Sequence, residues 1–164
     1  MSNDASMSLA DLLTTERIVC GVDARSKKRA LELLAESLTR GDDDLGQGVA
    51  FTSLIGRERL GSTAVGHGVA LPHGRVDSID ASRGAFVRLT TPIDFEAPDG
   101  EPVDLLFGLL VPAECGAEHL AALSAAAVVF NDPTLREALR RAPDSDAVLT
   151  LLAGDGPRRH AAGG

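Results

Sequence analysis

A short histidine-containing segment, residues 66–74, combines the residue types that could do chemistry in this chain. Pro72 fixes its own φ and keeps Leu71 extended, while Gly74 removes side-chain bulk just after His73. We therefore expect the imidazole of His73 at the exposed end of a strand, beside bare backbone whose N–H groups could meet an anion. Such an imidazole is a nucleophile near neutral pH, because much of it is uncharged there. The local composition fits a histidine that only caps a strand equally well.

Several elements must position this segment, and apolar spacing predicts those that precede it. Alternating apolar residues predict a short strand over 18–22. Ser26 is a suitable N-cap for a helix that Gly41 ends. Its apolar residues lie at i, i+3, i+4 and i+7: Leu31, Leu34, Ala35 and Leu38. A second helix, roughly 45–55, is expected to bury three apolar side chains: Val49, Phe51 and Leu54.

Strands are predicted in the middle of the chain and helices at its end. Residues 69–71 read as a strand that ends at Pro72, and 85–89 as another. Residues 103–111 are too apolar to alternate, which favours a buried central strand. Three helices are predicted to follow, over 116–130, 134–141 and 145–152, the first broken by the Asn-Asp-Pro sequence at 131–133. This mixture predicts an α/β fold with a mixed sheet covered by helices.

Length and charge exclude several classes of protein. The chain has 164 residues, which fits one domain with a real hydrophobic core. Sixteen Lys and Arg against twenty-four Asp and Glu give a net charge of −8. Such a chain repels phosphate backbones and anionic membranes, so we expect no nucleic-acid partner and no membrane insertion. With 5 Phe and no Trp or Tyr, base-stacking platforms are not expected either.

The two cysteines and the chain ends indicate a compartment and a domain plan. Cys20 and Cys115 form no CxxC motif, which favours a reducing compartment. The start of the chain lacks the basic segment followed by an apolar run that is typical of a signal peptide. A cytoplasmic location is therefore expected. Residues 1–8 and 154–164 are predicted to be tails that flank one domain over 9–153.

Residues 58–74 resemble the phosphorylation-site signature of the type-2 IIA domains of the bacterial phosphoenolpyruvate-dependent phosphotransferase system (PTS), the fructose and mannitol class. The signature requires an acidic or amide residue, six arbitrary positions, an apolar residue, Gly or Ala, and two arbitrary positions. An apolar residue, Ala, an apolar residue, Pro, His and a small residue then follow. Every required position is matched, by Glu58, Val65, Gly66, Val69, Ala70, Leu71, Pro72, His73 and Gly74.

The resemblance covers about residues 9–152 and favours the nitrogen-related branch, the IIA-Ntr proteins. The stretches that resemble this branch are 26–32, 102–107 and 109–113. The resemblance implies a single three-layer α/β/α sandwich around a mixed sheet. It also implies a phosphocarrier in which His73 accepts a phosphoryl group, on Nε2, from an HPr-like carrier protein. No cofactor or metal is implied, and the downstream partners would be regulatory target proteins.

A phosphoryl group on His73 brings nearly two negative charges, which need hydrogen-bond donors. The resemblance implies Arg57 and His119 as its catalytic partners. His119 would lie in the first turn of a helix, where the macrodipole also favours an anion. The glycine-rich backbone is expected to contribute N–H groups around Gly66, Gly68 and Gly74. The hydroxyl of Ser62 is a further candidate donor.

Three alternatives stay open from the sequence. One is a sugar-specific IIA component that passes the phosphoryl group to a IIB domain, although His67 replaces the acidic residue typical of those members. Another is a Cys-His₃ zinc centre, whose ligands would be His67, His73, Cys115 and His119. A Ser/His/Asp hydrolase is weaker still, because the chain has no G-x-S-x-G elbow.

Overall fold

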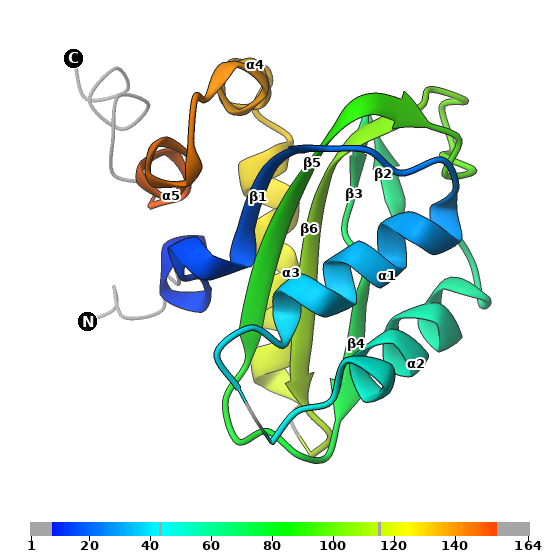
Figure 1. Ribbon diagram of the computed structural model, residues 1–164, viewed down its shortest axis with the longest axis vertical. Helices are drawn as coiled ribbons and strands as arrows, with labels where there is room; N and C mark the ends of the chain where they lie inside the picture. Colours follow the sequence, from blue (N-terminus) through cyan, green and yellow to red (C-terminus); the bar gives the residue numbers. More distant parts are fainter. Residues whose placement is uncertain (1–7, 43, 115, 154–164) are drawn as a thin grey trace.

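The computed structural model describes residues 8–42, 44–114 and 116–153, without the side chains of residues 117–120. These residues form one six-stranded mixed sheet with helices on both faces (Figure 1). The strand order is β1-β5-β6-β3-β2, and β4 also pairs with β6. The strands are β1 (Ile18–Val22), β2 (Ala64–Gly66), β3 (Val69–Ala70), β4 (His73–Val76), β5 (Arg83–Ile93) and β6 (Val103–Pro112).

Strand β6 is the axis of the sheet, as its nearly unbroken apolar sequence predicts. It pairs antiparallel with β5 and parallel with β3 and β4, and β1 adds to β5 in parallel. Most of its side chains are buried, because both faces are covered by helices. The predicted mixed sheet is thus confirmed.

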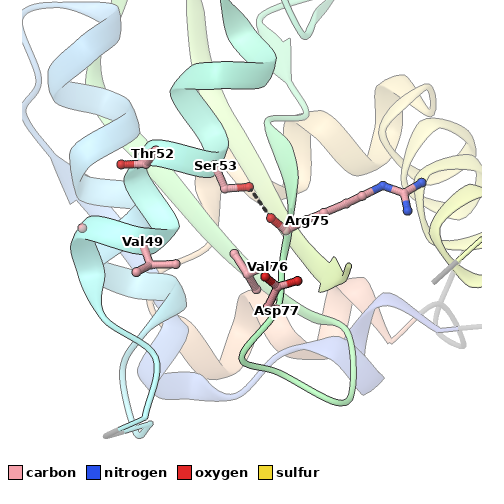
Figure 2. Close-up of a pocket in the computed structure, with 7 residues that line it drawn as sticks. Val49, Thr52, Ser53, Arg75, Val76 and Asp77 are labelled. Carbon is pink, nitrogen blue, oxygen red and sulfur yellow. Dashed lines mark hydrogen bonds between the residues drawn. The ribbon is translucent and has the colours of Figure 1, made fainter. Parts of the chain in front are cut away.

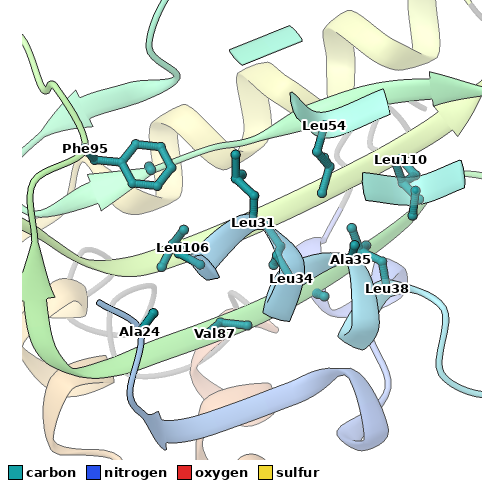
Figure 3. Packing of buried hydrophobic residues seen from close by; sticks show 14 of the residues in the cluster. Ala24, Leu31, Leu34, Ala35, Leu38, Leu54, Val87, Phe95, Leu106 and Leu110 are labelled. Atoms are coloured by element: carbon teal, nitrogen blue, oxygen red, sulfur yellow. The ribbon is translucent and has the colours of Figure 1, made fainter. Parts of the chain in front are cut away.

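Helices α1 (Lys27–Leu38) and α2 (Gln47–Glu58) cover one face of the sheet. Ser26 caps α1 by accepting a hydrogen bond from the Arg29 N–H. The predicted apolar stripe of α1 is completely buried, and Figure 3 shows it against the sheet: Leu31, Leu34, Ala35 and Leu38. Gly108 of β6 allows this approach, since a Cβ atom there would lie 2.7 Å from Leu34 Cδ2.

Helices α3 (Ala117–Phe130), α4 (Pro133–Arg141) and α5 (Ser145–Leu152) cover the other face (Figure 1). Two short 3-10 helices, η2 (Leu9–Leu12) and η3 (Thr15–Arg17), precede β1. Phe130 at the end of α3 packs against Phe86 of β5 and Phe107 of β6. The three-layer α/β/α arrangement is confirmed. Among the described residues, no helix is both long enough and apolar enough to cross a bilayer.

The structure corrects two element predictions. Helix α2 begins two residues and ends three residues later than predicted. Val49 was predicted to be buried but is 54% exposed, because Ala50 and Leu54, four residues apart, form the face of α2 that packs on the core. Strands β2 and β4 were not predicted; they are short, and each contains glycine where alternation would be expected.

The predicted chain ends can be compared with the structure only at their inner borders. Ser8, placed in the predicted tail, caps η2 and donates from its hydroxyl to Ala153 O, at 3.0 Å. The remainder of both predicted tails, residues 1–7 and 154–164, lies outside the described residues.

Candidate functional site

His73 begins strand β4, directly after the two residues that separate β4 from β3. Both short strands pair with β6, and the Leu109 N–H donates to Pro72 O, at 3.0 Å, across the junction. The Leu71 N–H turns the other way and donates to Thr63 O, at 3.0 Å. Pro72 therefore interrupts the strand without breaking its pairing, and His73 lies at this interruption rather than at a strand end facing solvent.

Side chains of β4 alternate between the two faces of the sheet. Gly74 and Val76 face α2: a Cβ on Gly74 would overlap Ser53 Oγ, and Val76 belongs to the core beneath α1 and α2. His73 and Arg75 consequently face the opposite layer, which contains α3. Figure 2 shows the Arg75 side chain pointing away from α2, while its carbonyl accepts a hydrogen bond from Ser53.

A backbone carbonyl orients the ring of His73. Nδ1 lies 2.9 Å from Leu71 O, and because a carbonyl only accepts, Nδ1 carries the proton. In the neutral ring the lone pair is then on Nε2. Burial lowers the pKa of His73 below its usual value, the Leu71 carbonyl opposes this, Arg57 lowers the pKa further and Glu58 raises it. The ring is thus favoured in its neutral, nucleophilic form.

Arg57, the penultimate residue of α2, lies in the electrostatic neighbourhood of His73, since it contributes to lowering the His73 pKa. Its Nη1 donates to Gly61 O, at 2.8 Å. That carbonyl is neutral, so the positive charge of Arg57 is not cancelled by this contact. The role of Arg57 as a partner of His73 stays a prediction.

Glu58 is the residue that the sequence analysis underused, treating it only as part of the signature. Its side chain is 2% exposed and forms an ion pair with Lys27 Nζ, at 2.9 Å. It also accepts hydrogen bonds from Thr63, from the N–H at 3.0 Å and from Oγ1 at 2.6 Å. The acidic signature position therefore ties the end of α2 to α1 and to the segment before β2.

The structure does not bring Gly66 and Gly68 to His73, which corrects their predicted role. Gly68 O accepts from the N–H groups of Asp104 and Leu105, whereas His73 is opposite Leu109. From Leu105 to Leu109 is four residues, or roughly 13 Å of strand. The two glycines instead form the turn between β2 and β3, with φ of 100° and 79°. The sequence analysis placed these glycines beside His73, whereas the hairpin brings them to the start of β6.

Two other predicted phosphate contacts have structural explanations. The hydroxyl of Ser62 donates to Phe95 O, at 2.7 Å, and accepts from the Ala64 N–H, at 3.1 Å. Its proton is therefore committed to a carbonyl. Gly74 lacks a side chain where Ser53 of α2 packs against β4.

His119 belongs to the first turn of α3, as predicted, but its side chain lies outside the described residues, and so does Cys115. Two of the four ligands proposed for the zinc centre are described, and the sheet register separates them. His67 is in the β2–β3 turn near the start of β6, and His73 is opposite Leu109. Within the described residues, no group of three His, Cys, Asp or Glu is placed to hold a metal ion.

Arg75 is a candidate that the sequence analysis missed. It shares the sheet face of His73, two residues along β4, and its Nη1 donates to Ala113 O, at 3.1 Å, at the end of β6. It also borders a groove of about 620 Å³ between α2 and β4 (Figure 2). The period of two residues in a strand would have revealed it, had residues 73–76 been recognised as a strand.

The comparisons with known proteins place this geometry in a family. Residues 11–154 match the family described as phosphoenolpyruvate-dependent sugar phosphotransferase system, EIIA 2. The chain is 42% identical to the nitrogen regulatory protein of Bradyrhizobium diazoefficiens over 90% of this chain and 95% of that protein.

Solved structures agree with this match. The crystal structure of the nitrogen regulatory protein IIA-Ntr from Neisseria meningitidis is 40% identical with a TM-score of 0.82, covering 88% of this chain and 98% of that one. The mannitol IIA of Escherichia coli is more distant, at 25% identity and a TM-score of 0.73, covering 86% of this chain and 99% of that one.

Proposed function

Because this chain belongs to the type-2 EIIA family of the phosphotransferase system, in the branch of the nitrogen regulatory proteins, we propose that it is a phosphocarrier whose phosphoryl acceptor is His73. In this proposal the donor is a cytoplasmic HPr-like protein, and the phosphorylated and bare forms differ in the regulatory proteins that they bind. The supporting observation is the His73 ring, with Nδ1–H held by Leu71 O, a lowered pKa and Arg57 nearby.

The transfer exchanges one imidazole for another. The Nε2 lone pair of His73 attacks the phosphorus of the carrier's phosphohistidine, and the phosphorus–nitrogen bond to the carrier breaks. The bonding pair returns to the carrier's imidazole, which leaves neutral if its phosphorylated ring was protonated. The His73 ring gains the positive charge and keeps its Nδ1 proton, which Leu71 O stabilises. Because like replaces like, positioning and electrostatics carry the catalysis.

Donors for the transferred phosphoryl group are proposed on two sides of His73. Arg57 approaches from the end of α2, and Arg75 shares the strand face of His73. We keep His119 in the proposal on its position in the first turn of α3, where the backbone N–H groups also favour an anion. The backbone N–H of Gly74, next to His73, stays a proposed donor. Gly66 and Gly68 lie in the β2–β3 turn, and Ser62 donates its proton to Phe95 O, so these three are not part of the proposal.

A sugar-specific role, in which the phosphoryl group passes on to a IIB domain, is the second candidate. A solved complex of the Escherichia coli mannitol IIA with phosphorylated mannitol IIB supports this candidate. The greater identity to nitrogen regulatory proteins favours regulation over sugar transfer here.

Incubation with phosphoenolpyruvate, enzyme I and an HPr-like carrier tests the proposal. The protein should gain a single acid-labile phosphoryl group, measured by intact mass, and His73→Ala should gain none. His67→Ala is a matched control, because it removes the same side chain from the distant turn; it should be phosphorylated like the wild type. An unmodified wild-type protein, or a modified His73→Ala variant, would overturn the assignment.

A further inference from the structure

The carboxylate of Glu58 occupies an unfavourable place. It is the last residue of α2, where the helix dipole presents partial negative charge, and its side chain is almost completely buried. Both conditions penalise an anion unless close donors compensate for them. A buried carboxylate at this end of a helix needs an explanation beyond general packing.

The compensating donors come from two distant parts of the chain. Lys27, at the start of α1, lies 2.9 Å from Glu58 Oε2 and 2.7 Å from Glu96 Oε1, with its Nζ over the ring of Phe95. Partial burial alone lowers the pKa of Lys27, but the hydrogen bonds and charges of Glu96 and Glu58 raise it on balance. Thr63 donates two further hydrogen bonds to the Glu58 carboxylate, from its N–H to Oε2 and from its hydroxyl to Oε1. The carboxylate is thus held from three directions.

One chain of hydrogen bonds leads from Glu58 to the His73 ring. Glu58 fixes Thr63, whose carbonyl accepts the N–H of Leu71. The carbonyl of Leu71 in turn accepts the Nδ1 proton of His73, at 2.9 Å. The orientation of the ring therefore depends on a peptide that Glu58 holds in place.

A second connection leads from Glu58 to Arg57. The turn after α2 is closed at its start by the Gly61 N–H donating to Glu58 O, and at its end by Thr63 on the Glu58 carboxylate. Gly61 O, between these anchors, accepts Arg57 Nη1 at 2.8 Å. The guanidinium and the imidazole thus take their positions from the same buried carboxylate.

We propose that Glu58, with its partner Lys27, is a positioning residue for the phosphoryl transfer: it holds the Thr63 turn so that the His73 ring and the Arg57 guanidinium face the same incoming phosphoryl group. This inference rests on the proposed function and extends it to residues that do not touch the phosphoryl group. Glu58 acts through Thr63, and its charge is a secondary influence on the ring.

A purely structural pair would give a different result from a positioning pair. If the pair only joined α1 to α2, replacing both charges together should restore the fold and the activity, since matched neutral replacements of buried pairs are often tolerated. If the carboxylate positions the site, the doubly substituted protein folds but transfers slowly. The Lys27→Met/Glu58→Leu protein, which leaves no acceptor for Thr63, therefore separates the two roles.

The experiment compares the wild type, Glu58→Leu, and Lys27→Met/Glu58→Leu for transfer from the phosphorylated HPr-like carrier. We expect both variants to lose about 10- to 100-fold in kcat with little change in KM, the loss typical of a misplaced reacting group. Thermal unfolding should show the double variant folded. The His73 pKa, followed by NMR of the ring, should fall in both variants because the carboxylate raises it.

The control variant should remove a carboxylate that does not influence the His73 ring. Within the described residues, Arg57 and Glu58 are the charged side chains whose influence on the His73 pKa is resolved. Glu32→Gln removes a carboxylate from an exposed ion pair of α1 with Arg29, so it should leave kcat and the His73 pKa unchanged. A folded double variant with wild-type kcat would overturn the inference alone. A wild type that accepts no phosphoryl group would overturn the proposed function, and the inference with it.

Discussion

The two histidine turns of this protein contain similar residues and use them in opposite ways. The turn around His67 has glycines on both sides, an arginine, Arg140, and two carboxylates, Asp99 and Asp104. The junction at His73 has a following glycine, Arg57 and the carboxylate of Glu58. Residue types alone would assign the two the same chemistry.

At the His67 turn the polar groups are paired with one another. The His67 N–H donates to Asp99, at 2.9 Å, and its carbonyl accepts from Arg140, at 2.8 Å. Arg140 also binds both oxygens of Asp104, so its charge is neutralised locally. This cluster fixes the β2–β3 turn, in which His67 has a φ of 59°. It is a scaffold.

At the His73 junction the arginine is used differently. Arg57 binds a neutral carbonyl, and no carboxylate within the described residues lies at ion-pair distance from it. The His73 ring is itself oriented, by the carbonyl of Leu71. A cation whose charge is not cancelled, next to a positioned nucleophile, is what an incoming phosphoryl group requires. The pairing of the charges, more than their presence, distinguishes a site from a scaffold.

The largest expected effect comes from exchanging the two arginines for alanine. Arg57→Ala should slow transfer about 100-fold or more, while its stability stays near that of the wild type, because its hydrogen bond is at a turn surface. Arg140→Ala should keep the transfer rate and lose about 1–3 kcal/mol of stability, since Asp104 loses its partner. Transfer kinetics and urea unfolding measure both. Equal effects of the two variants on transfer would contradict the distinction between a reactive site at His73 and a structural cluster at His67.

Glycine substitutions at the two turns should also separate them. A Cβ on Gly74 would overlap Ser53, which forces α2 away from β4 and moves Arg57 relative to His73. Gly74→Ala should lose about 1–3 kcal/mol and slow transfer about tenfold beyond what unfolding explains. Gly68→Ala meets Arg140 and requires a strained φ of 79°, so it should lose stability but keep transfer in the folded fraction. A Gly74→Ala protein that is destabilised yet fully active would show that α2 does not position the site.

The sequence predicted those elements whose pattern of apolar residues extends over many positions. The helix stripe of α1 and the apolar run of β6 predicted their elements, and the family resemblance pointed to His73 and Arg57 as candidate site residues. Strand β4 was missed because its four residues, with one apolar side chain, carry no usable alternation. Arg75 was missed for the same reason, because only the alternation of a strand places it on the same face as His73.

Other features depend on contacts between residues far apart in sequence. Gly66 and Gly68 are close to His73 in the chain, but the hairpin separates them from it. Glu58 was considered only as part of the signature; its burial depends on Lys27, 31 positions earlier (58 − 27), which no local pattern shows. Nearness in the sequence thus suggested a contact between the two glycines and His73 that does not form, and it gave no sign of the ion pair between Lys27 and Glu58.

The pH dependence of transfer should follow His73. Because burial and Arg57 lower its pKa, the ring is neutral at pH 7, and the rate should be flat there and fall only below the His73 pKa. Arg57→Gln removes one cause of the lowering, so the fall should begin at higher pH. Single-turnover rates across pH 4.5–8, a window set around the ordinary pKa of about 6.5, measure this. A rate that rises on acidification would contradict a neutral nucleophile.

Stability should respond to the same ring with a definite sign. A lowered folded-state pKa means that the unfolded chain binds more protons below about pH 6.5. The contribution of His73 is therefore complete above that pH and is lost as the pH falls toward its folded-state pKa. Urea unfolding of the wild type and His73→Gln should differ in pH slope only within this window. Parallel pH profiles would show that the ring is not significantly desolvated in the folded protein.

The smallest expected effect concerns Arg75. Its substitution tests the donor on the strand side of His73 separately from Arg57, the donor on the α2 side. Its Nη1 already binds Ala113 O, so recruiting it to a phosphoryl group exchanges one hydrogen bond for a stronger, charge-assisted one. Arg75→Gln, which can keep a bond to a carbonyl, should therefore slow transfer only a few-fold and shorten the lifetime of phosphorylated His73. Arg141→Gln, an exposed arginine of α4 paired with Glu137, should change neither. If Arg75→Gln matched Arg57→Ala in severity, the two faces of the junction would contribute equally, and α2 would lose its leading role at this site.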